Sequence, residues 1–356
     1  MDSASKKNPV PTIAGVDLFC GAGGLTHGLI RGGIKIVAGI DVDPGCRFPY
    51  EANNPSKFLE RDISLIDPEE ISKFYKDANF TLLAGCAPCQ PFSTYSRSGR
   101  GKKYSSQWPL MSKFGQLVEE IQPDFVSMEN VPQLAEHPVF EEFLRSLHGY
   151  EVWQSSIECS SIGIPQTRKR LVLLASRYGK ISFDHTEEQF SETTVRRFIG
   201  HLPPLNAGEQ NPYDPLHKAS KLSALNMSRI RASKPGGTWR DWDTALQAIC
   251  HQKTSGSTYP SVYGRMEWDK PAPTITTQCF GFGNGRFGHP EQDRAISLRE
   301  AAMLQTFPES YQFVPKGEPI KFNRMGRLIG NAVPVRLGEV IAQSFVKHAK
   351  EIVKTA

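Results

Sequence analysis

The chain has 356 residues, of which 39% are hydrophobic and 22% are charged, and its net charge is +5 at pH 7. No apolar run approaches the ~20 residues of a membrane span, so this composition indicates a globular protein and excludes an integral membrane protein. The length fits two domains, or one large domain with an insertion, and the seven scattered cysteines favour free thiols over a disulfide framework.

The N-terminal residues 1–11 are polar and lack the apolar segment of a signal peptide. We therefore expect a flexible tail, and a protein that stays in the reducing cytoplasm where it is made.

Short apolar runs alternate with amphipathic stretches in the first half of the chain, which is an α/β rhythm. Several of the runs are continuously apolar, as expected for strands of a largely parallel sheet covered on both faces. The predicted strands are 12–19, 35–40, 80–85, 124–128 and 170–175. The predicted helices between them are 25–31, 68–77, 110–121 and 139–147.

A glycine-rich turn, DLFCGAGG, follows the first predicted strand at residues 17–24. Glycines at such a turn let a ligand approach the backbone amides. A dinucleotide fingerprint counted from Gly21 would need glycine where Thr26 stands, so an adenosyl cofactor without phosphates fits better. Asp41 ends the second predicted strand, where a carboxylate can accept ribose hydroxyls.

Two cysteines, Cys86 and Cys89, follow the strand 80–85 in the segment GCAPCQPFS. A C-x-x-C pair is compatible with a redox dithiol or half of a zinc site, but no second pair or histidine cluster completes four zinc ligands. A Pro-Cys-Gln-Pro turn is a poor place to bury a structural cysteine, which leaves Cys89 as a candidate nucleophile at the end of the sheet.

The α/β rhythm ends at about Ser176, and residues up to about His289 are rich in Pro, Gly, Ser and Asn. This predicts a second, smaller domain. Helices resume at 297–304, entered through a Ser297 cap with Glu300 at the capping-box position, and at 335–354. Two acid-free basic stretches, 90–118 and 216–240, are candidates to face phosphates or to be solvated loops.

Six motifs stand in a fixed order from Asp17 to Pro334: DLFCGAGG, GCAPCQPFS, MENV, IPQTRKR, SLREAAMLQTFP and GNAVP. With this set the chain resembles the DNA cytosine-5 methyltransferases, and its compactness is similar to the stand-alone bacterial enzymes of restriction-modification systems. The resemblance implies an S-adenosylmethionine-dependent methyltransferase fold, α/β with a doubly wound and mostly parallel sheet, and an inserted target-recognition domain. The implied division is 12–180 with 297–356 for catalysis and 181–296 for recognition.

The chemistry of the implied reaction explains the motif residues. Carbon 5 of cytosine is a poor nucleophile until sulfur adds to carbon 6, and by the resemblance Cys89 supplies that sulfur. Negative charge then builds on the ring, so a protonated carboxyl near nitrogen 3 and a cation near the carbonyl oxygen lower the barrier. Glu129 and Arg170 are the candidates, while Asn130 resembles the residue that braces the cysteine loop and Arg168 one that contributes to the cytosine pocket.

The resemblance also implies a pocket for S-adenosylmethionine and no metal. Phe19 is expected against the adenine, three glycines near the methionine moiety, and Asp41 on the ribose. The last helix is expected to fold back onto the first domain so that the C-terminal motif closes the pocket. The remaining residues implied for this pocket are Gly21, Gly23, Gly24, Asp62, Ile63, Asn331 and Val333.

The implied substrate is a cytosine flipped out of double-stranded DNA, because carbon 6 is inaccessible inside a duplex. Segments 236–239 and 274–277 are candidates to face the groove, with Trp239 equally compatible with a core position. We expect a monomer on DNA, acting alongside a cognate restriction endonuclease.

Three alternatives stay open at this point. The first is a tRNA cytosine methyltransferase on the same catalytic domain, against which the large insertion argues. The second is a DNA-binding regulator without catalysis, disfavoured by the retained Cys89, Glu129 and Arg170. The third is a nicotinamide oxidoreductase, disfavoured by Thr26.

Overall fold

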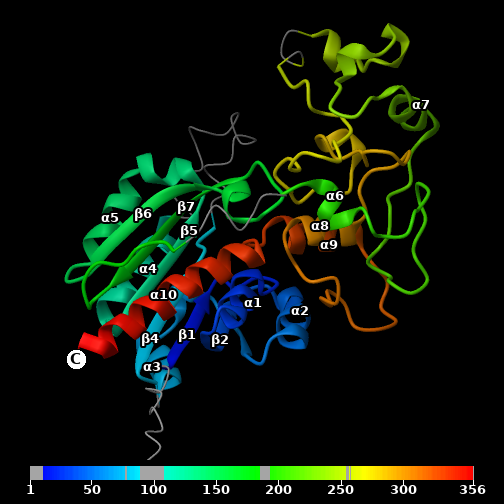
Figure 1. Cartoon of the computed structure of the whole chain (residues 1–356). Helices are drawn as coiled ribbons and strands as arrows, with labels where there is room; N and C mark the ends of the chain where they lie inside the picture. Colours follow the sequence, from blue (N-terminus) through cyan, green and yellow to red (C-terminus); the bar gives the residue numbers. More distant parts are fainter. Residues whose placement is uncertain are drawn as a thin grey trace, which may run out of the picture.

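The computed structural model describes residues 11–76, 78–88, 108–184, 193–253, 256 and 258–355. A seven-stranded sheet in the order β3-β2-β1-β4-β5-β7-β6 forms its centre (Figure 1). The pairs among β1 to β5 are parallel, whereas β7 is antiparallel to both β5 and β6. The strands are β1 (Ile13–Leu18), β2 (Lys35–Asp41), β3 (Lys57–Glu60), β4 (Phe80–Gly85), β5 (Phe125–Asn130), β6 (Glu151–Glu158) and β7 (Lys169–Ser176).

Helices cover both faces of this sheet, which is why its central strands are continuously buried. One face packs on α1 (Gly24–Arg31) and α10 (Val335–Thr355), and the long C-terminal helix thus returns to the first strand, as expected. The opposite face packs on α3 (Pro68–Ser72), α4 (Trp108–Ile121) and α5 (Pro138–Ser146). In the part of the chain that the structure describes, no helix is both long and apolar enough to cross a membrane.

The five predicted strands and the mostly parallel α/β sheet are confirmed, with differences at the strand ends of one or two residues. Two strands were not predicted. β3 is only four residues long, and β6 is a largely exposed edge strand with few apolar residues. The predicted helix 68–77 is shorter, because α3 gives way to a 3-10 turn at Lys73–Tyr75.

The strand order changes direction between β1 and β4, since β2 and β3 lie on one side and β5 on the other. In an open α/β sheet, ligands bind outside the carboxyl ends of the strands at such a point. The glycine-rich turn after β1, the cysteine loop after β4 and the end of β5 therefore meet at one edge.

Where the structure describes it, the region after β7 is mostly irregular and contains the α-helices α6 (Val195–Ile199) and α7 (Ala224–Ala232) and several short 3-10 turns. It lies to one side of the sheet together with α8 (Leu298–Leu304) and α9 (Phe322–Gly330) (Figure 1). Trp239 is 5% exposed and belongs to a small core of this region, so it does not face a groove. Arg229 is also buried, against Trp242 and Tyr263, which corrects the expectation that this member of the basic stretch faces phosphates.

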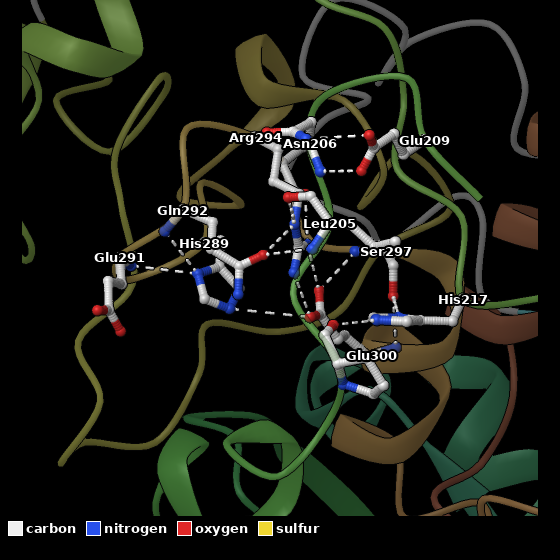
Figure 2. Close-up of polar contacts among 12 residues, drawn as sticks. Leu205, Asn206, Glu209, His217, His289, Glu291, Gln292, Arg294, Ser297 and Glu300 are labelled. Carbon is white, nitrogen blue, oxygen red and sulfur yellow. Dashed lines mark hydrogen bonds and ion pairs between the residues drawn. The ribbon is translucent and has the colours of Figure 1, made fainter. Parts of the chain in front are cut away.

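A buried ion pair joins this region to α8 (Figure 2). Arg294 places two nitrogens 2.7 Å from the two carboxylate oxygens of Glu300, and its Nε donates to the carbonyl of Leu205 and to Gln292. Glu300 also accepts from the backbone N–H of Ser297, which completes the predicted capping box. Because nearly every polar atom is paired, the buried charges are compensated.

Candidate functional site

The loop that leads to the candidate nucleophile starts at the carboxyl end of β4. Cys89 itself lies outside the described residues, but Cys86, Ala87 and Pro88 continue directly from the strand. Asn130, at the end of β5, donates its side-chain N–H to the carbonyl of Ala87 at 3.0 Å. The predicted bracing residue thus contacts the loop two residues before Cys89.

Glu129 is almost completely buried, at 2% exposure, beside this loop. Cys86 donates its thiol hydrogen to Oε2 of Glu129 at 2.7 Å. Arg170 at the start of β7 forms an ion pair, with Nε 2.8 Å from Oε1 of Glu129. This N–H is not aimed at Oε1, which has no hydrogen bond from the described residues. Glu129 is therefore held from two sides and keeps an oxygen that can still interact with a ligand.

Arg168 lies at the same end of β7, with 4% exposure. Its Nη1 donates to the carbonyl of Ile275 at 3.4 Å, and its Nε has no hydrogen-bond partner within the described ranges. Burial and the neighbouring charge of Arg170 lower the pKa of Arg168 to about 10. Two guanidinium groups consequently accompany one carboxyl group, which makes this cluster suitable for a developing negative charge.

The glycine-rich turn and the end of β2 meet at the other part of this edge. The backbone N–H of Gly21 donates to Oδ2 of Asp41 at 2.9 Å, and the N–H of Asp43 donates to Oδ1 at the same distance. Burial raises the pKa of Asp41. Gly23 has φ of +89°, a left-handed conformation that favours glycine at the start of α1.

The C-terminal motif closes onto this turn. A Cβ atom at Gly24 would lie 2.3 Å from the carbonyl oxygen of Val333, so only glycine allows the two backbones to approach this closely. Asn331 is exposed at the end of α9, and Val333 is buried. Residues from the two ends of the chain that were predicted for one pocket are thus adjacent.

Two of the three residues predicted for the adenine side pack in one apolar cluster. Phe19 and Ile63 pack against the same apolar cluster, and Phe19 has a positive φ of 59° directly after β1. Asp62 is exposed and accepts hydrogen bonds from the N–H and hydroxyl of Ser64, which lower its pKa. Its carboxylate is therefore held in one orientation at the protein surface.

Asp17 and Cys86 are two residues whose roles the sequence interpretation missed. Asp17 is 1% exposed, and burial raises its pKa to about 7. Thr26 donates to its Oδ2 at 2.6 Å, whereas Oδ1 has no hydrogen-bond partner among the described residues. Asp17 lies in the motif DLFCGAGG and Cys86 in GCAPCQPFS, so the sequence places both residues near the site. The residue pattern does not indicate which side chains they contact.

The buried Glu129 carboxyl group and its two guanidinium neighbours thus lie near the end of β5, which β4 separates from the strand that leads into the glycine-rich turn. Within the ranges described, no group of three or more His, Cys, Asp or Glu side chains is arranged to hold a metal ion. The arrangement can stabilise a ring that gains negative charge while a cationic donor is held nearby.

Comparison with known proteins is consistent with this geometry. The family model described as C-5 cytosine-specific DNA methylase matches residues 13–347. The chain is 53% identical over 337 residues to the type II methylase M.HgiDII of Herpetosiphon aurantiacus, covering 92% of this chain and 94% of the relative. It is 31% identical to the type II methyltransferase M1.HphI of Haemophilus parahaemolyticus, over 93% and 86% of the two chains.

The fold is also similar to a crystal structure of an E. coli prophage product assigned as a DNA modification methyltransferase. The TM-score is 0.71 at 21% identity, over 96% of this chain and 100% of the other.

Proposed function

Because this chain belongs to the C-5 cytosine-specific DNA methylase family, and so is a methyltransferase acting on cytosine in DNA, we propose that it methylates a flipped-out cytosine within a specific duplex sequence, through a covalent adduct with Cys89. The observation that carries this proposal is the buried Glu129 carboxyl group, paired with Arg170 beside the loop to Cys89.

Each residue of the base pocket has a distinct part in the proposed step. The Cys89 thiolate forms a bond to carbon 6, and the displaced electrons move toward nitrogen 3 and the carbonyl oxygen. Glu129 gives a proton to nitrogen 3, while Arg170 and Arg168 compensate charge at the carbonyl oxygen. Once carbon 5 carries the methyl group, its proton passes to a water molecule, nitrogen 3 returns its proton to Glu129, and the sulfur–carbon bond breaks, which restores the ring, the carboxyl group and the thiolate.

We assign the glycine-rich turn and the end of β2 to S-adenosylmethionine, which would supply the methyl group when bound. The unpaired, buried Oδ1 of Asp17 is suited to a cationic amine or sulfonium group. Asp41 would face the ribose, and Gly21 leaves open space for the methionine moiety, because nothing lies within 4 Å of the position that a Cβ atom would take there. Asn331 and Val333 would cover the ligand, with Phe19, Ile63 and Asp62 on the adenine side.

We assign target recognition to residues 181–296 and catalysis to 12–180 with 297–356. Type II methylases among the relatives support a restriction-modification context with a cognate endonuclease. In that context we expect a monomer that acts in the bacterial cytoplasm.

The covalent step is tested with DNA amplified from 5-fluorodeoxycytidine triphosphate, so that every target sequence carries the analogue. With S-adenosylmethionine present, the methyl group is transferred to carbon 5, and the fluorine there cannot leave as a cation in the final elimination, so the adduct persists. We expect a complex that survives denaturing electrophoresis with the wild type and with Cys86→Ser, but not with Cys89→Ser. A complex formed by Cys89→Ser and lost in Cys86→Ser would contradict the assignment.

A further inference from the structure

Two buried glutamines connect three parts of the molecule. Gln166 precedes the arginines of the base pocket, and Gln305 follows α8. Both side chains are 0% exposed. A side-chain amide buried this deeply needs partners for its oxygen and both its hydrogens, since an unpaired polar group costs stability.

The contacts of Gln166 lead in two directions. Its Oε1 accepts from the backbone N–H of Ile275 at 2.9 Å. Its Nε2 donates to the carbonyl of Leu304 at 2.7 Å and to Oε1 of Gln305 at 2.8 Å. Both hydrogens and the oxygen of this amide are therefore used.

Gln305 continues the chain of hydrogen bonds toward the C-terminal motif. Its Nε2 donates to the carbonyls of Ile329 at 2.8 Å and Ala332 at 3.2 Å. Ala332 stands between Asn331 and Val333, the residues expected to close the cofactor pocket. The path from the amide of Ile275 to the carbonyl of Ala332 thus runs through two side-chain amides, each donating in the same direction.

The first end of this path is also attached to the base pocket. Backbone hydrogen bonds of 2.8 Å join Pro165 and Thr167 to Ala272 on either side of Gln166. The carbonyl of Ile275 accepts from Arg168 at 3.4 Å. A displacement of the segment 272–277 would therefore move a guanidinium group of the base pocket and one end of the amide path together.

We propose that Gln166 and Gln305 are positioning residues whose amide relay couples binding of DNA at segment 272–277 to binding of the cofactor beside Ala332. This inference rests on the proposed function, because it assigns the two ends of the relay to those two ligands. Coupling between two sites is reciprocal and typically changes affinity 5- to 150-fold. Aligned hydrogen bonds in a buried path polarise one another, which suits such a role.

The test compares dissociation constants for S-adenosylhomocysteine, measured by calorimetry with the free enzyme and with enzyme saturated by sheared unmethylated plasmid DNA. We expect DNA to tighten binding about tenfold in the wild type. Gln166→Met and Gln305→Met keep the side-chain length but lose the amide, and each should reduce this factor to below about threefold. The double variant should be no worse than either single one, because the path is already broken.

Gln292→Met is the matched control, since it removes a partly buried amide that contacts Arg294 and Leu205 but lies outside the relay. It should keep the wild-type coupling factor. Relay variants that fold and keep the full factor, or a wild type that transfers methyl groups without coupling, would overturn the relay alone. A wild type that neither binds the ligand nor methylates DNA would instead overturn the proposed function.

Hydrogen exchange of the wild type gives a second test that needs no variant. Adding S-adenosylhomocysteine without DNA should slow exchange of the backbone amides of 272–277, because the amide of Ile275 donates into the relay. Unchanged exchange in this segment, with the ligand demonstrably bound, would contradict the inference.

Discussion

At the scale of single residues, the site depends on how Glu129 is held. Its carboxyl group is buried between Cys86 and Arg170, one strand away from the loop to Cys89. The sequence predicted Glu129, Arg170 and Asn130 through the family motifs. It did not predict the thiol contact of Cys86, because three-dimensional proximity across parallel strands leaves no trace in local residue spacing.

Glu129→Gln keeps the shape of the side chain but removes the proton that the proposed step transfers to nitrogen 3. We expect the kcat of methyl transfer to fall by about 10²- to 10⁴-fold, the usual range for general acid catalysis. Glu119→Gln, an exposed change on α4, is the matched control and should leave kcat unchanged. A loss of less than about tenfold for Glu129→Gln would remove its assigned role.

Cys86→Ala deletes the donor to Oε2 of Glu129, whereas Cys86→Ser keeps a hydroxyl donor there. One lost hydrogen bond to a buried carboxyl group corresponds to about 1–2 kcal/mol, or about tenfold in kcat. In steady-state kinetics, the kcat of Cys86→Ser should therefore be higher than that of Cys86→Ala. Equal rates for the two variants would mean that the thiol does not position Glu129.

At the scale of elements, the site is built where strands end and helices pack closely. The strands that could be predicted were those with continuous apolar runs. The polar edge strand β6 and the short strand β3 were not predicted, because they lack such runs. Four helices were not predicted: α2 (Arg47–Asn53), α6, α7 and α9. α6 spans five residues and α7 has no apolar face of helical period, whereas α9 does have such a face and was still missed.

Helices α1 and α10 cross so closely at Gly28 that a side chain there would collide with α10. A Cβ atom at Gly28 would lie 2.1 Å from the carbonyl oxygen of Val335 and 2.7 Å from Cα of Gly338. Gly28→Ala should therefore push α10 away, destabilise the protein by about 1–3 kcal/mol and weaken cofactor binding. Thermal unfolding and calorimetry check both effects, and a variant with wild-type stability would show that the helices do not meet this closely.

In the whole molecule, one apolar cluster joins the edge strand β3 and the glycine-rich turn to the irregular region, and a buried polar joint around Glu300 connects that region to α8. The sequence predicted that a second region follows β7, and it predicted the capping box at Ser297. The sequence did not predict the polar joint around Glu300. The residues that take part in it, Leu205, His217 and Gln292, lie far from Glu300 in the chain or in segments without periodicity.

This joint should make stability sensitive to acid. Burial lowers the pKa of His289 to about 4. Burial by itself would raise the pKa of Glu300, but the ion pair with Arg294 outweighs burial and lowers this pKa to about 2. Both folded-state values lie below the unfolded ones, so the unfolded chain binds more protons in acid. The contribution of His289 to the free energy of unfolding is present above pH 6.5 and is lost as the pH falls toward 4. The contribution of Glu300 is lost as the pH falls below about 4.5.

Between pH 6.5 and 5, His289 alone should account for a loss on the order of 2 kcal/mol. His289→Asn keeps an acceptor for the N–H groups of Glu291 and Gln292 but does not titrate. Its melting temperature should consequently fall less steeply than that of the wild type over this range. Identical slopes would show that His289 is already accessible to protons in the folded protein.

Transfer of labelled methyl groups from S-adenosylmethionine to unmethylated duplex DNA and, separately, to unmodified tRNA tests directly whether the enzyme methylates cytosine in DNA through Cys89. We predict label on carbon 5 of cytosine in DNA with the wild type, and none with Cys89→Ser. Label that enters only tRNA, or that still enters DNA in Cys89→Ser, would contradict the account.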